Sequence, residues 1–388
     1  MASLDAVRAR FARNEGLPFA DILTEASIRD VLNERGVRFR DRVFSPVTTI
    51  WGFLSQVLGE DHSCRDAVSR IIAHRAANGM AVCSPNTASY CKARSRVPMS
   101  VLSTLAKRTA EELQTSAGDL WKWNGRSVFI VDGSHVSMPD TAENQALYPQ
   151  PPTQQPGLGF PLARITVALS LATGACHDLA IAPYKGKGTG EKTLFRQMYN
   201  TLNPGDVVLA DALFDDYFIA CELCHRNIDL VARVQHERVE SRTAQSGPDG
   251  DIIVWQRPNK PHGMTGEQYR KYPKQLLMRQ VAIDARDKNN RVEQSKVLTT
   301  ILDQSIDGGQ IGDLYERRWD GEVFHAQCEE RDNLYRGGRS SYSRRIGVAE
   351  VGLLVPAAQA FRFRRKPMRE VKEDVPPRAR RDAINVSL

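Results

Sequence analysis

Two different spacings of apolar residues divide the chain. Over roughly its first 120 residues, apolar side chains recur three and four positions apart, which is the spacing of one face of an α-helix. Segments with this pattern are residues 21–32, 48–58, 64–77 and 99–113. Signals typical of strands are few in this part of the chain. The pattern therefore predicts a helical N-terminal domain over residues 1–122.

From Ser127 onward, short apolar runs typical of strands replace the helical spacing. The predicted elements are strands at residues 127–131, 163–171, 176–183, 206–210 and 229–234, with helices at 191–202 and 216–226. This order is that of a ribonuclease-H-like core, in which three antiparallel strands come first and the later strands run parallel. The sequence thus predicts an α/β fold, with residues 123–234 as the first part of its core.

The second half of the chain contains a long interruption of this pattern. Asp211 and Glu322 are 111 residues apart, which is too long for a simple connection. Strand-forming segments within the gap predict a β-rich insertion subdomain over residues 235–302. Residues 303–335 are then expected to complete the core with a helix. Residues 336–388 are rich in Arg and show little periodicity.

Three carboxylates stand out against this background. Asp132 and Asp211 each end a predicted buried strand, and Glu322 lies on a probable helix. The carboxyl ends of buried strands present side chains to ligands in α/β sheets. Carboxylates that converge there suit two divalent cations in a phosphoryl-transfer site, because Mg²⁺ prefers oxygen ligands. An isolated Asp after a strand is more often a cap or turn residue, so the prediction depends on the combination.

Composition restricts the class of protein without identifying it. The chain has 388 residues, of which 41% are hydrophobic, and carries no apolar run long enough to span a membrane. Together with an N-terminus that lacks the apolar core of a signal peptide, this predicts a cytoplasmic protein. Seven scattered cysteines predict reduced thiols rather than a disulfide framework.

The net charge of +7 suits an anionic partner such as nucleic acid, but its distribution is uneven. Residues 323–388 contain 14 Lys and Arg against 8 Asp and Glu, so this tail supplies most of the excess. DNA binding therefore requires local basic patches. One candidate is the segment 84–96, where Lys92 and Arg94 would face phosphates as in a helix-turn-helix unit. The alternative is a solvated basic helix.

Several of these segments resemble the DDE transposases of bacterial insertion sequences, in the insertion-sequence-four family whose members excise through DNA hairpins. The resemblance covers residues 11–322. Its most specific pieces are Val131-Asp132-Gly133-Ser134, residues 148–157 and 159–161, Gly188-Thr189-Gly190-Glu191, Leu209-Ala210-Asp211 with Phe214, and the tyrosine, arginine and glutamate signature at Tyr315, Arg318 and Glu322.

This resemblance implies a metal-dependent enzyme. Asp132, Asp211 and Glu322 would bind two Mg²⁺ or Mn²⁺ ions, and the protein would cut at element ends and join the 3′-hydroxyl to target DNA. Tyr315 and Arg318 would contact a phosphate near the scissile bond. Arg318 could equally be an ion-pair partner of Glu322.

The resemblance also implies partners. These are double-stranded DNA, at transposon ends and at the target, and a second copy of the chain in a synaptic homodimer. The protein would associate with the nucleoid when bound to DNA. Trp255 lies where the family would place an aromatic residue near a displaced base, and a buried structural Trp is an equal alternative.

The chain departs from the family in two places. Ala212 replaces an arginine that usually follows the second aspartate, and Glu329 stands where the family has a lysine. Residues 325–331 can be encoded so that the next reading frame gives Met-Arg-Asn-Val-Lys-Ser, with its lysine at position 329. A frameshift near codon 324 or 325 is therefore our hypothesis, and it predicts impaired activity.

Two alternatives to an active transposase remain open at this point. One is a catalytically impaired remnant that acts only as a DNA-binding protein, for which DNA binding without metal-dependent cleavage would be diagnostic. The other is a ribonuclease-H-like nuclease that cuts without joining. The tyrosine, arginine and glutamate signature has no explanation in the second case.

Overall fold

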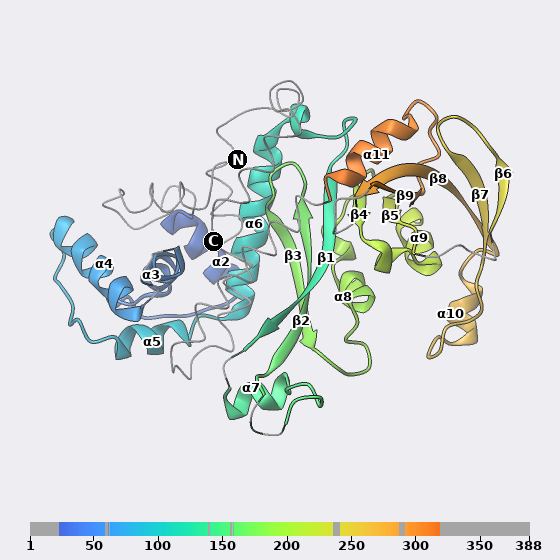
Figure 1. The fold of residues 1–388 in the computed structure, drawn as a ribbon. Coiled ribbons are helices and arrows are strands. Elements are labelled where there is room, and N and C mark those ends of the chain that lie inside the picture. Colours follow the sequence, from blue (N-terminus) through green and yellow to red (C-terminus); the bar gives the residue numbers. More distant parts are fainter. Residues whose placement is uncertain are drawn as a thin grey trace. The chain divides into compact units, whose positions relative to one another are not determined.

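The computed structural model describes residues 23–58, 61, 63–138, 140–155, 157, 159–235, 241–286 and 292–318. The chain divides into two compact units, one built from helices and one built around a sheet (Figure 1). The predicted third carboxylate, Glu322, and the basic tail over residues 336–388 lie outside the described residues. The predicted mixed α/β fold is confirmed.

The helical unit is formed by the elements that the three-to-four spacing predicted. Its described helices are α2 (Glu25–Glu34), α3 (Pro46–Leu58), α4 (Cys64–Ala77), α5 (Ala88–Arg94) and α6 (Met99–Ala117). Two of them begin at a hydroxyl cap, because Thr24 Oγ1 accepts from Ser27 N at 3.1 Å and Ser63 Oγ from Asp66 N at 3.0 Å. Helix α6 continues past the predicted end and stops at Gly118, whose φ of 68° favours glycine.

Apolar side chains on one face of each helix make the core of this unit. Ile28 on α2, Leu54 on α3 and Leu105 on α6 belong to one buried cluster. A smaller cluster joins α4 to α5, with Ile71 and Tyr90 fully buried. Burial of such side chains stabilises the unit by about 1.5–3 kcal/mol each relative to exposure.

The other unit is built around a nine-stranded sheet of described strands, in the order β3-β2-β1-β4-β5-β9-β8-β7-β6 (Figure 1). The strands are β1 (Val128–Ser137), β2 (Leu162–Ser170), β3 (Cys176–Pro183), β4 (Val207–Ala210), β5 (Asp229–Arg233), β6 (Ser241–Gln245), β7 (Asp251–Gln256), β8 (Gln275–Arg286) and β9 (Val292–Thr299). Strands β1, β4 and β5 run parallel to one another, whereas β2 is antiparallel to β1.

The predicted insertion does not form a separate sheet. Its strands β6 to β9 extend the central sheet through an antiparallel pairing of β9 with β5, in which Val231 lies opposite Thr299. The residues of the insertion therefore share backbone hydrogen bonds with the core. The domain boundaries at residues 235 and 302 stay predictions.

Helices α8, α9 and α11 pack against strands of the sheet. The described helices of this unit are α7 (Ala142–Leu147), α8 (Glu191–Gln197), α9 (Tyr217–Cys224), α10 (Gly266–Arg270) and α11 (Gly308–Glu316). The chain also contains three short 3-10 turns, which are η1 (Asp119–Trp121), η2 (Tyr199–Thr201) and η3 (Ala212–Phe214). Helix α8 packs against β2 and α9 against β5, whereas α11 packs against β8 and β5. None of the described helices is long and apolar enough to cross a membrane.

One buried histidine makes the stability of the sheet unit depend on pH. His177 in β3 is 4% exposed, and its ring contacts Phe129 edge-on with 5.0 Å between the ring centroids. Among the described residues its Nε2 atom has no hydrogen-bond partner. Burial lowers the pKa of His177 from 6.5 to about 4, and the charge of Asp178 opposes this shift.

The free energy of unfolding should therefore fall as the solution is acidified. The unfolded chain takes up a proton on His177 below pH 6.5, whereas the folded chain does so only near pH 4. This difference in pKa lowers the free energy of unfolding by about 3 kcal/mol between pH 6.5 and pH 4. Urea unfolding at pH 7 and near pH 4 measures this effect. The free energy of unfolding should fall less between the two pH values in His177→Leu than in the parent chain. An equal loss in both proteins would contradict the assignment.

Candidate active site

Asp132 lies within a strand and not at its end. The apolar run before it predicted a strand that stops at Val131, but β1 continues to Ser137. The reason is the antiparallel pairing with β2, which extends to Ser137 opposite Leu162. The parallel pairing with β4 ends at Val131 opposite Ala210. Asp132 is therefore the first residue of β1 beyond the parallel part of the sheet.

The register of β1 and β4 makes the two aspartates neighbours. Because Val131 pairs with Ala210, Asp132 and Asp211 are the next residues on adjacent parallel strands. Neighbouring strands lie about 4.8 Å apart, so the two residues lie side by side where the parallel pairing of β1 and β4 ends. Both are half-buried. The structure thus brings together two residues that are 79 positions apart in sequence.

Backbone amides orient both carboxylates. Gly133 N donates to Asp132 Oδ1 at 2.8 Å, and Leu213 N donates to Asp211 Oδ1 at 2.9 Å. The second of these bonds caps the 3-10 turn η3, which follows β4 directly. Each carboxylate is therefore held by a backbone amide one or two residues further along the chain, which reduces the reorganisation that ligand binding would require.

A further carboxylate, Glu191, lies beside this pair. It begins α8, and a Cβ atom built on Gly133 would lie 2.3 Å from its Cδ and Oε2 atoms. The Glu191 side chain thus occupies the space above Gly133 that only glycine leaves open. Burial raises the pKa of Glu191, and the charges of Asp211 and Asp132 add to this effect, whereas Arg164 opposes it.

Arg164 on β2 partly neutralises this group of carboxylates. Its Nε atom lies 3.7 Å from Glu191 Oε1, with side-chain exposures of 21% and 18%. Arg164 Nη1 also donates to the backbone oxygen of Thr189 at 3.2 Å, which ties the turn before α8 to the sheet. The motif that ends in Glu191 was part of the family resemblance, but neither Glu191 nor Arg164 was predicted as a site residue. The packing of α8 against β2 brings Glu191 close to Gly133 and Arg164.

Adding a methyl group at Gly133 should displace the Glu191 carboxylate. The Gly133→Ala variant is expected to bind DNA normally but to cleave it about tenfold more slowly, because a shift of the order of 1 Å in a catalytic environment is costly. The matched control is Gly190→Ala, which places the same group next to Glu191 where no atom lies within 4 Å. The prediction is tested by comparing the cleavage rates of the Gly133→Ala and Gly190→Ala variants at saturating DNA. Equal rates for the two variants would contradict it.

The described end of α11 lies near Asp211. Tyr315 is 5% exposed, and its burial raises its pKa, with opposing effects from Arg318 and Arg233 and a smaller upward effect from Asp211. The guanidinium of Arg318 lies 5.9 Å from the centre of the Tyr315 ring, and Arg318 is 8% exposed. Tyr315 and Arg318 are thus brought together beside the aspartates. Their predicted contact with a phosphate stays a prediction.

Helix α11 ends earlier than the sequence indicated. Residues 303–335 were expected to contribute a helix that carries Glu322, but α11 ends at Glu316. The last hydrogen bonds span three residues, from Arg317 N to Leu314 O and from Arg318 N to Tyr315 O, so the backbone tightens into a turn. Glu322 lies outside the described residues, and its predicted place as third ligand is untested.

Trp255 lies in the core of the sheet unit. It belongs to β7, is 5% exposed, and contacts Tyr217 edge-on with ring centroids 5.3 Å apart. This corresponds to the structural alternative considered for this residue. Stacking on a displaced base would require its ring to leave the contact with Tyr217, and its role in DNA binding remains a prediction.

The two basic residues predicted to contact DNA from the helical unit have different surroundings. Lys92 on α5 is exposed. Arg94 is half-buried and donates from Nη1 to Gln56 Oε1 at 2.8 Å and to Cys64 Sγ at 3.3 Å. Lys92 is therefore the more accessible of the two to a phosphate, and neither contact is tested. Helix α5 has only seven residues and covers the middle of the predicted segment 84–96.

The donor set at the sheet edge fits a hard divalent cation in part. Two neighbouring aspartates supply the oxygen ligands that Mg²⁺ and Mn²⁺ prefer. Among the residues that the structure describes, no group of three His, Cys, Asp or Glu is arranged to hold a metal ion. The predicted third ligand, Glu322, is not one of these residues.

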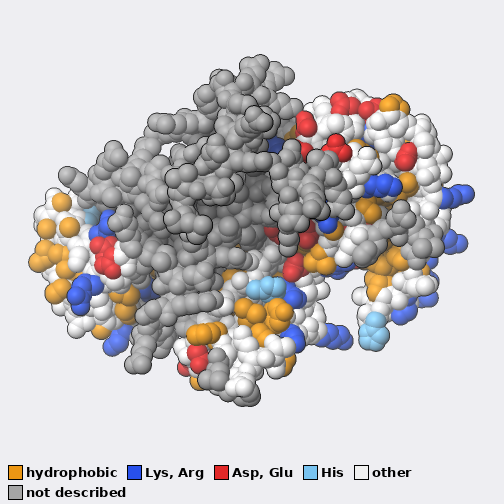
Figure 2. Space-filling view, viewed as in Figure 1, with side chains coloured by type: hydrophobic (Ala, Val, Ile, Leu, Met, Phe, Trp, Pro, Cys, Tyr) orange, Lys and Arg blue, Asp and Glu red, His pale blue; other side chains and the backbone are white. Residues whose placement is uncertain are grey.

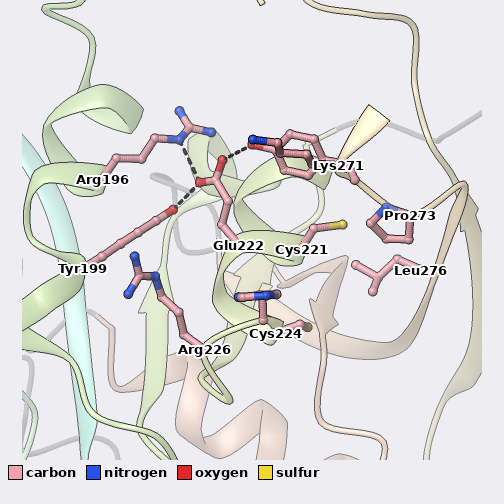
Figure 3. A pocket seen from close by; sticks show the side chains of 11 residues that line it. Arg196, Tyr199, Cys221, Glu222, Cys224, Arg226, Lys271, Pro273 and Leu276 are labelled. Carbon is pink, nitrogen blue, oxygen red and sulfur yellow. Dashed lines mark hydrogen bonds and ion pairs between the residues drawn. The ribbon is translucent and has the colours of Figure 1, made fainter. Parts of the chain in front are cut away.

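The sheet unit also contains a cavity of about 670 Å³ whose described lining includes none of these carboxylates. Glu222 on α9 is its central polar group and accepts hydrogen bonds from Arg196 Nε at 2.8 Å, Tyr199 OH at 2.7 Å and Tyr272 OH at 2.5 Å (Figure 3). Tyr272 belongs to the insertion, so this network connects the insertion to the core. It has no place in the chemistry of the aspartates.

Comparison with known proteins agrees with the chemistry of the sheet edge. Residues 123–354, more than half of the chain, match the family described as Transposase DDE domain. The chain is also 23% identical over 327 residues to the transposase InsG of insertion sequence element IS4 from Escherichia coli (strain K12), covering 82% of this chain and 69% of InsG. The family match includes positions 132, 211 and 322 and continues to residue 354, so it does not stop where a frameshift was hypothesised. The chain belongs to the DDE transposase family and resembles the bacterial transposases of the insertion-sequence-four type.

Proposed function

We propose that this chain is a DNA transposase that cleaves DNA at transposon ends and joins the ends to target DNA. The observation that carries this proposal is the register of β1 and β4, which places Asp132 and Asp211 side by side at one edge of the sheet. The strand order β3-β2-β1-β4-β5, with β2 antiparallel to β1 and with β1, β4 and β5 parallel to one another, supports a ribonuclease-H-like core. Membership of the DDE family supports the same chemistry.

Asp132, Asp211 and Glu322 would hold the two divalent cations, Mg²⁺ or Mn²⁺. When bound, such ions activate the attacking oxygen and neutralise charge on the phosphate. The chain itself orients the carboxylates through the amides of Gly133 and Leu213. Glu191 and its partner Arg164 set the local charge next to this centre.

The surface charges of the sheet unit favour some approaches of DNA over others. Figure 2 shows acidic side chains gathered over α11 and the segment that leads into it, where Asp303, Asp307, Asp313 and Glu316 are exposed. This patch would repel a phosphate backbone. Exposed basic side chains follow α10 in the insertion, at Arg270, Lys271 and Lys274. These residues, and Lys92 in the helical unit, are our candidates for sequence-independent phosphate contacts.

Cleavage of DNA that carries the element ends is the experiment that tests this function. The expected result is Mg²⁺-dependent cutting at the ends followed by joining of the 3′-hydroxyl to a second DNA. Cutting without joining would instead indicate the simple nuclease. Binding to the ends without either reaction would indicate a remnant that only binds DNA, and absence of binding would contradict all three.

The frameshift hypothesis predicts a difference between this chain and its repaired version. Restoring the alternative frame after codon 324 is expected to raise the cleavage rate about a hundredfold. The reason is that a displacement of a catalytic carboxylate by about 1 Å can lower the rate by about that factor. The nucleotide sequence across codons 318 to 340 shows first whether such a frame exists. Equal cleavage by both chains would contradict the hypothesis.

A further inference from the structure

Two thiols of the helical unit lie in contact with each other. Cys64 is the first residue of α4, and Cys91 lies on α5, 27 positions later in the sequence. Their sulfur atoms are 3.7 Å apart, and both side chains are partly exposed. A disulfide bond is about 2.05 Å long, so the two sulfurs need to approach by only about 1.7 Å to form one.

Two polar side chains contact the sulfur atom of Cys64. Arg94 Nη1 donates to Cys64 Sγ at 3.3 Å, and the Gln56 side-chain amide lies 3.7 Å from the same sulfur. Cys64 also lies in the first turn of a 14-residue helix, where the peptide dipoles attract anions. Reactive cysteines are found in electropositive, partly exposed places of this kind.

Cys91 has the opposite environment. Burial raises the pKa of the Cys91 thiol, and the neighbouring Cys64 adds to the effect, whereas Arg94 opposes it. The two thiols therefore differ in role, with Cys64 as the one that reacts first with an oxidant and Cys91 as its partner.

We propose that Cys64 and Cys91 are a peroxide-responsive thiol pair that forms a reversible disulfide between α4 and α5. In the first step the Cys64 thiolate attacks one oxygen of hydrogen peroxide, which gives a sulfenic acid and releases hydroxide that takes up a proton to form water. In the second step the Cys91 thiolate attacks the Cys64 sulfur and displaces a second hydroxide, which is also protonated to water. Two thiols and one peroxide thus give one disulfide and two molecules of water.

The disulfide would change the basic surface of α5. It would fix α5 to the first turn of α4 and alter the contact in which Arg94 Nη1 donates to Cys64 Sγ in the reduced state. Lys92 lies next to Cys91 and is exposed. The proposal concerns the thiols themselves and does not depend on the function proposed above.

The other described cysteines make a useful comparison. Cys83 lies in the same unit and is a free, partly exposed thiol. Cys221 and Cys224 are close in sequence on α9, but burial raises the pKa of Cys221 to about 12. A thiol with such a pKa is a poor nucleophile at neutral pH.

Peptide mapping of the full chain after treatment with hydrogen peroxide tests the proposal. The reduced protein is exposed to peroxide, alkylated and digested without reductant. We expect the Cys64–Cys91 peptide pair to be at least about tenfold more abundant than any other disulfide and to disappear on addition of dithiothreitol. In Cys91→Ser, dimedone should label Cys64 as a sulfenic acid, because the thiol that would consume it is missing.

Two control variants distinguish a specific Cys64–Cys91 disulfide from unspecific oxidation of cysteines. Cys83→Ser should form the Cys64–Cys91 disulfide at the rate of the parent chain. Arg94→Gln should form it about tenfold more slowly, because the positive charge near Cys64 is lost. Circular dichroism shows whether each variant is folded. Scrambled pairs of similar abundance, links between chains only, or no Cys64–Cys91 peptide from the folded parent protein would overturn the proposal.

Discussion

Replacing Asp132 or Asp211 by asparagine is expected to lower the rate of metal-dependent DNA cleavage at least about a thousandfold. An asparagine keeps the size of the side chain and the backbone hydrogen bond to its oxygen, but it lacks the charge that a divalent cation requires. The two residues leave adjacent parallel strands at the same edge, so each substitution should affect the same step. Cleavage assays under single-turnover conditions, with Mg²⁺ and with Mn²⁺, measure the loss.

The same variants should show that the defect lies in metal binding and not in folding. Mg²⁺ is expected to raise the thermal midpoint of the parent chain and to have little effect on Asp132→Asn, because a ligand stabilises only the state that binds it. The matched control is Asp284→Asn, on an exposed part of β8, which should cleave like the parent. Retention of cleavage in Asp132→Asn or Asp211→Asn would contradict the assigned site.

Removing the carboxylate of Glu222 is expected to destabilise the sheet unit by about 3 kcal/mol. Three donors converge on this side chain, from Arg196 on α8, Tyr199 on η2 and Tyr272 in the insertion. The Glu222 side chain is 18% exposed, so water can replace only part of these bonds in Glu222→Ala. The effect should be smaller in Glu222→Gln, which keeps an acceptor for the two tyrosines and loses the charge.

Urea unfolding of the full chain measures this effect. The control is Glu267→Ala, which removes an exposed carboxylate 3.6 Å from Lys271 in the same region and should change the free energy of unfolding by less than about 0.5 kcal/mol. A similar change in Glu222→Ala and Glu267→Ala would contradict the view that the network joins the insertion to the core. The slope of unfolding against urea should stay constant if the native state remains compact.

Glu191 fills the space beside Gly133, the residue that follows the first aspartate. The carboxylate of Glu191 fills the position of a Cβ atom on Gly133, and Arg164 limits the charge that accumulates there. A negatively charged group so close to two aspartates is unfavourable without a cation. This arrangement is consistent with the divalent ions that we propose for the site.

Local patterns in the sequence predicted several of the elements and singled out Asp132 and Asp211, which the register of β1 and β4 makes neighbours. The three-to-four spacing predicted the helix over residues 64–77, and the apolar run over residues 176–183 predicted a strand, with the bounds that the structure shows. Asp132 and Asp211 were predicted as neighbours because each follows an apolar run. Such patterns are reliable because they report which side of one element is buried.

Only the tertiary structure decided how distant elements meet. Strand β1 continues past Asp132 because β2 pairs with it, and the insertion joins the central sheet because β9 pairs with β5. The packing of α8 against β2 places Glu191 beside Gly133, although Glu191 and Asp132 are 59 positions apart in the sequence. The spacing of apolar residues in one segment does not show which other segment will pair with its backbone. It also does not show which side chain will occupy the space beside one of its glycines. These contacts depend on the register and fit of surfaces that are far apart in the sequence.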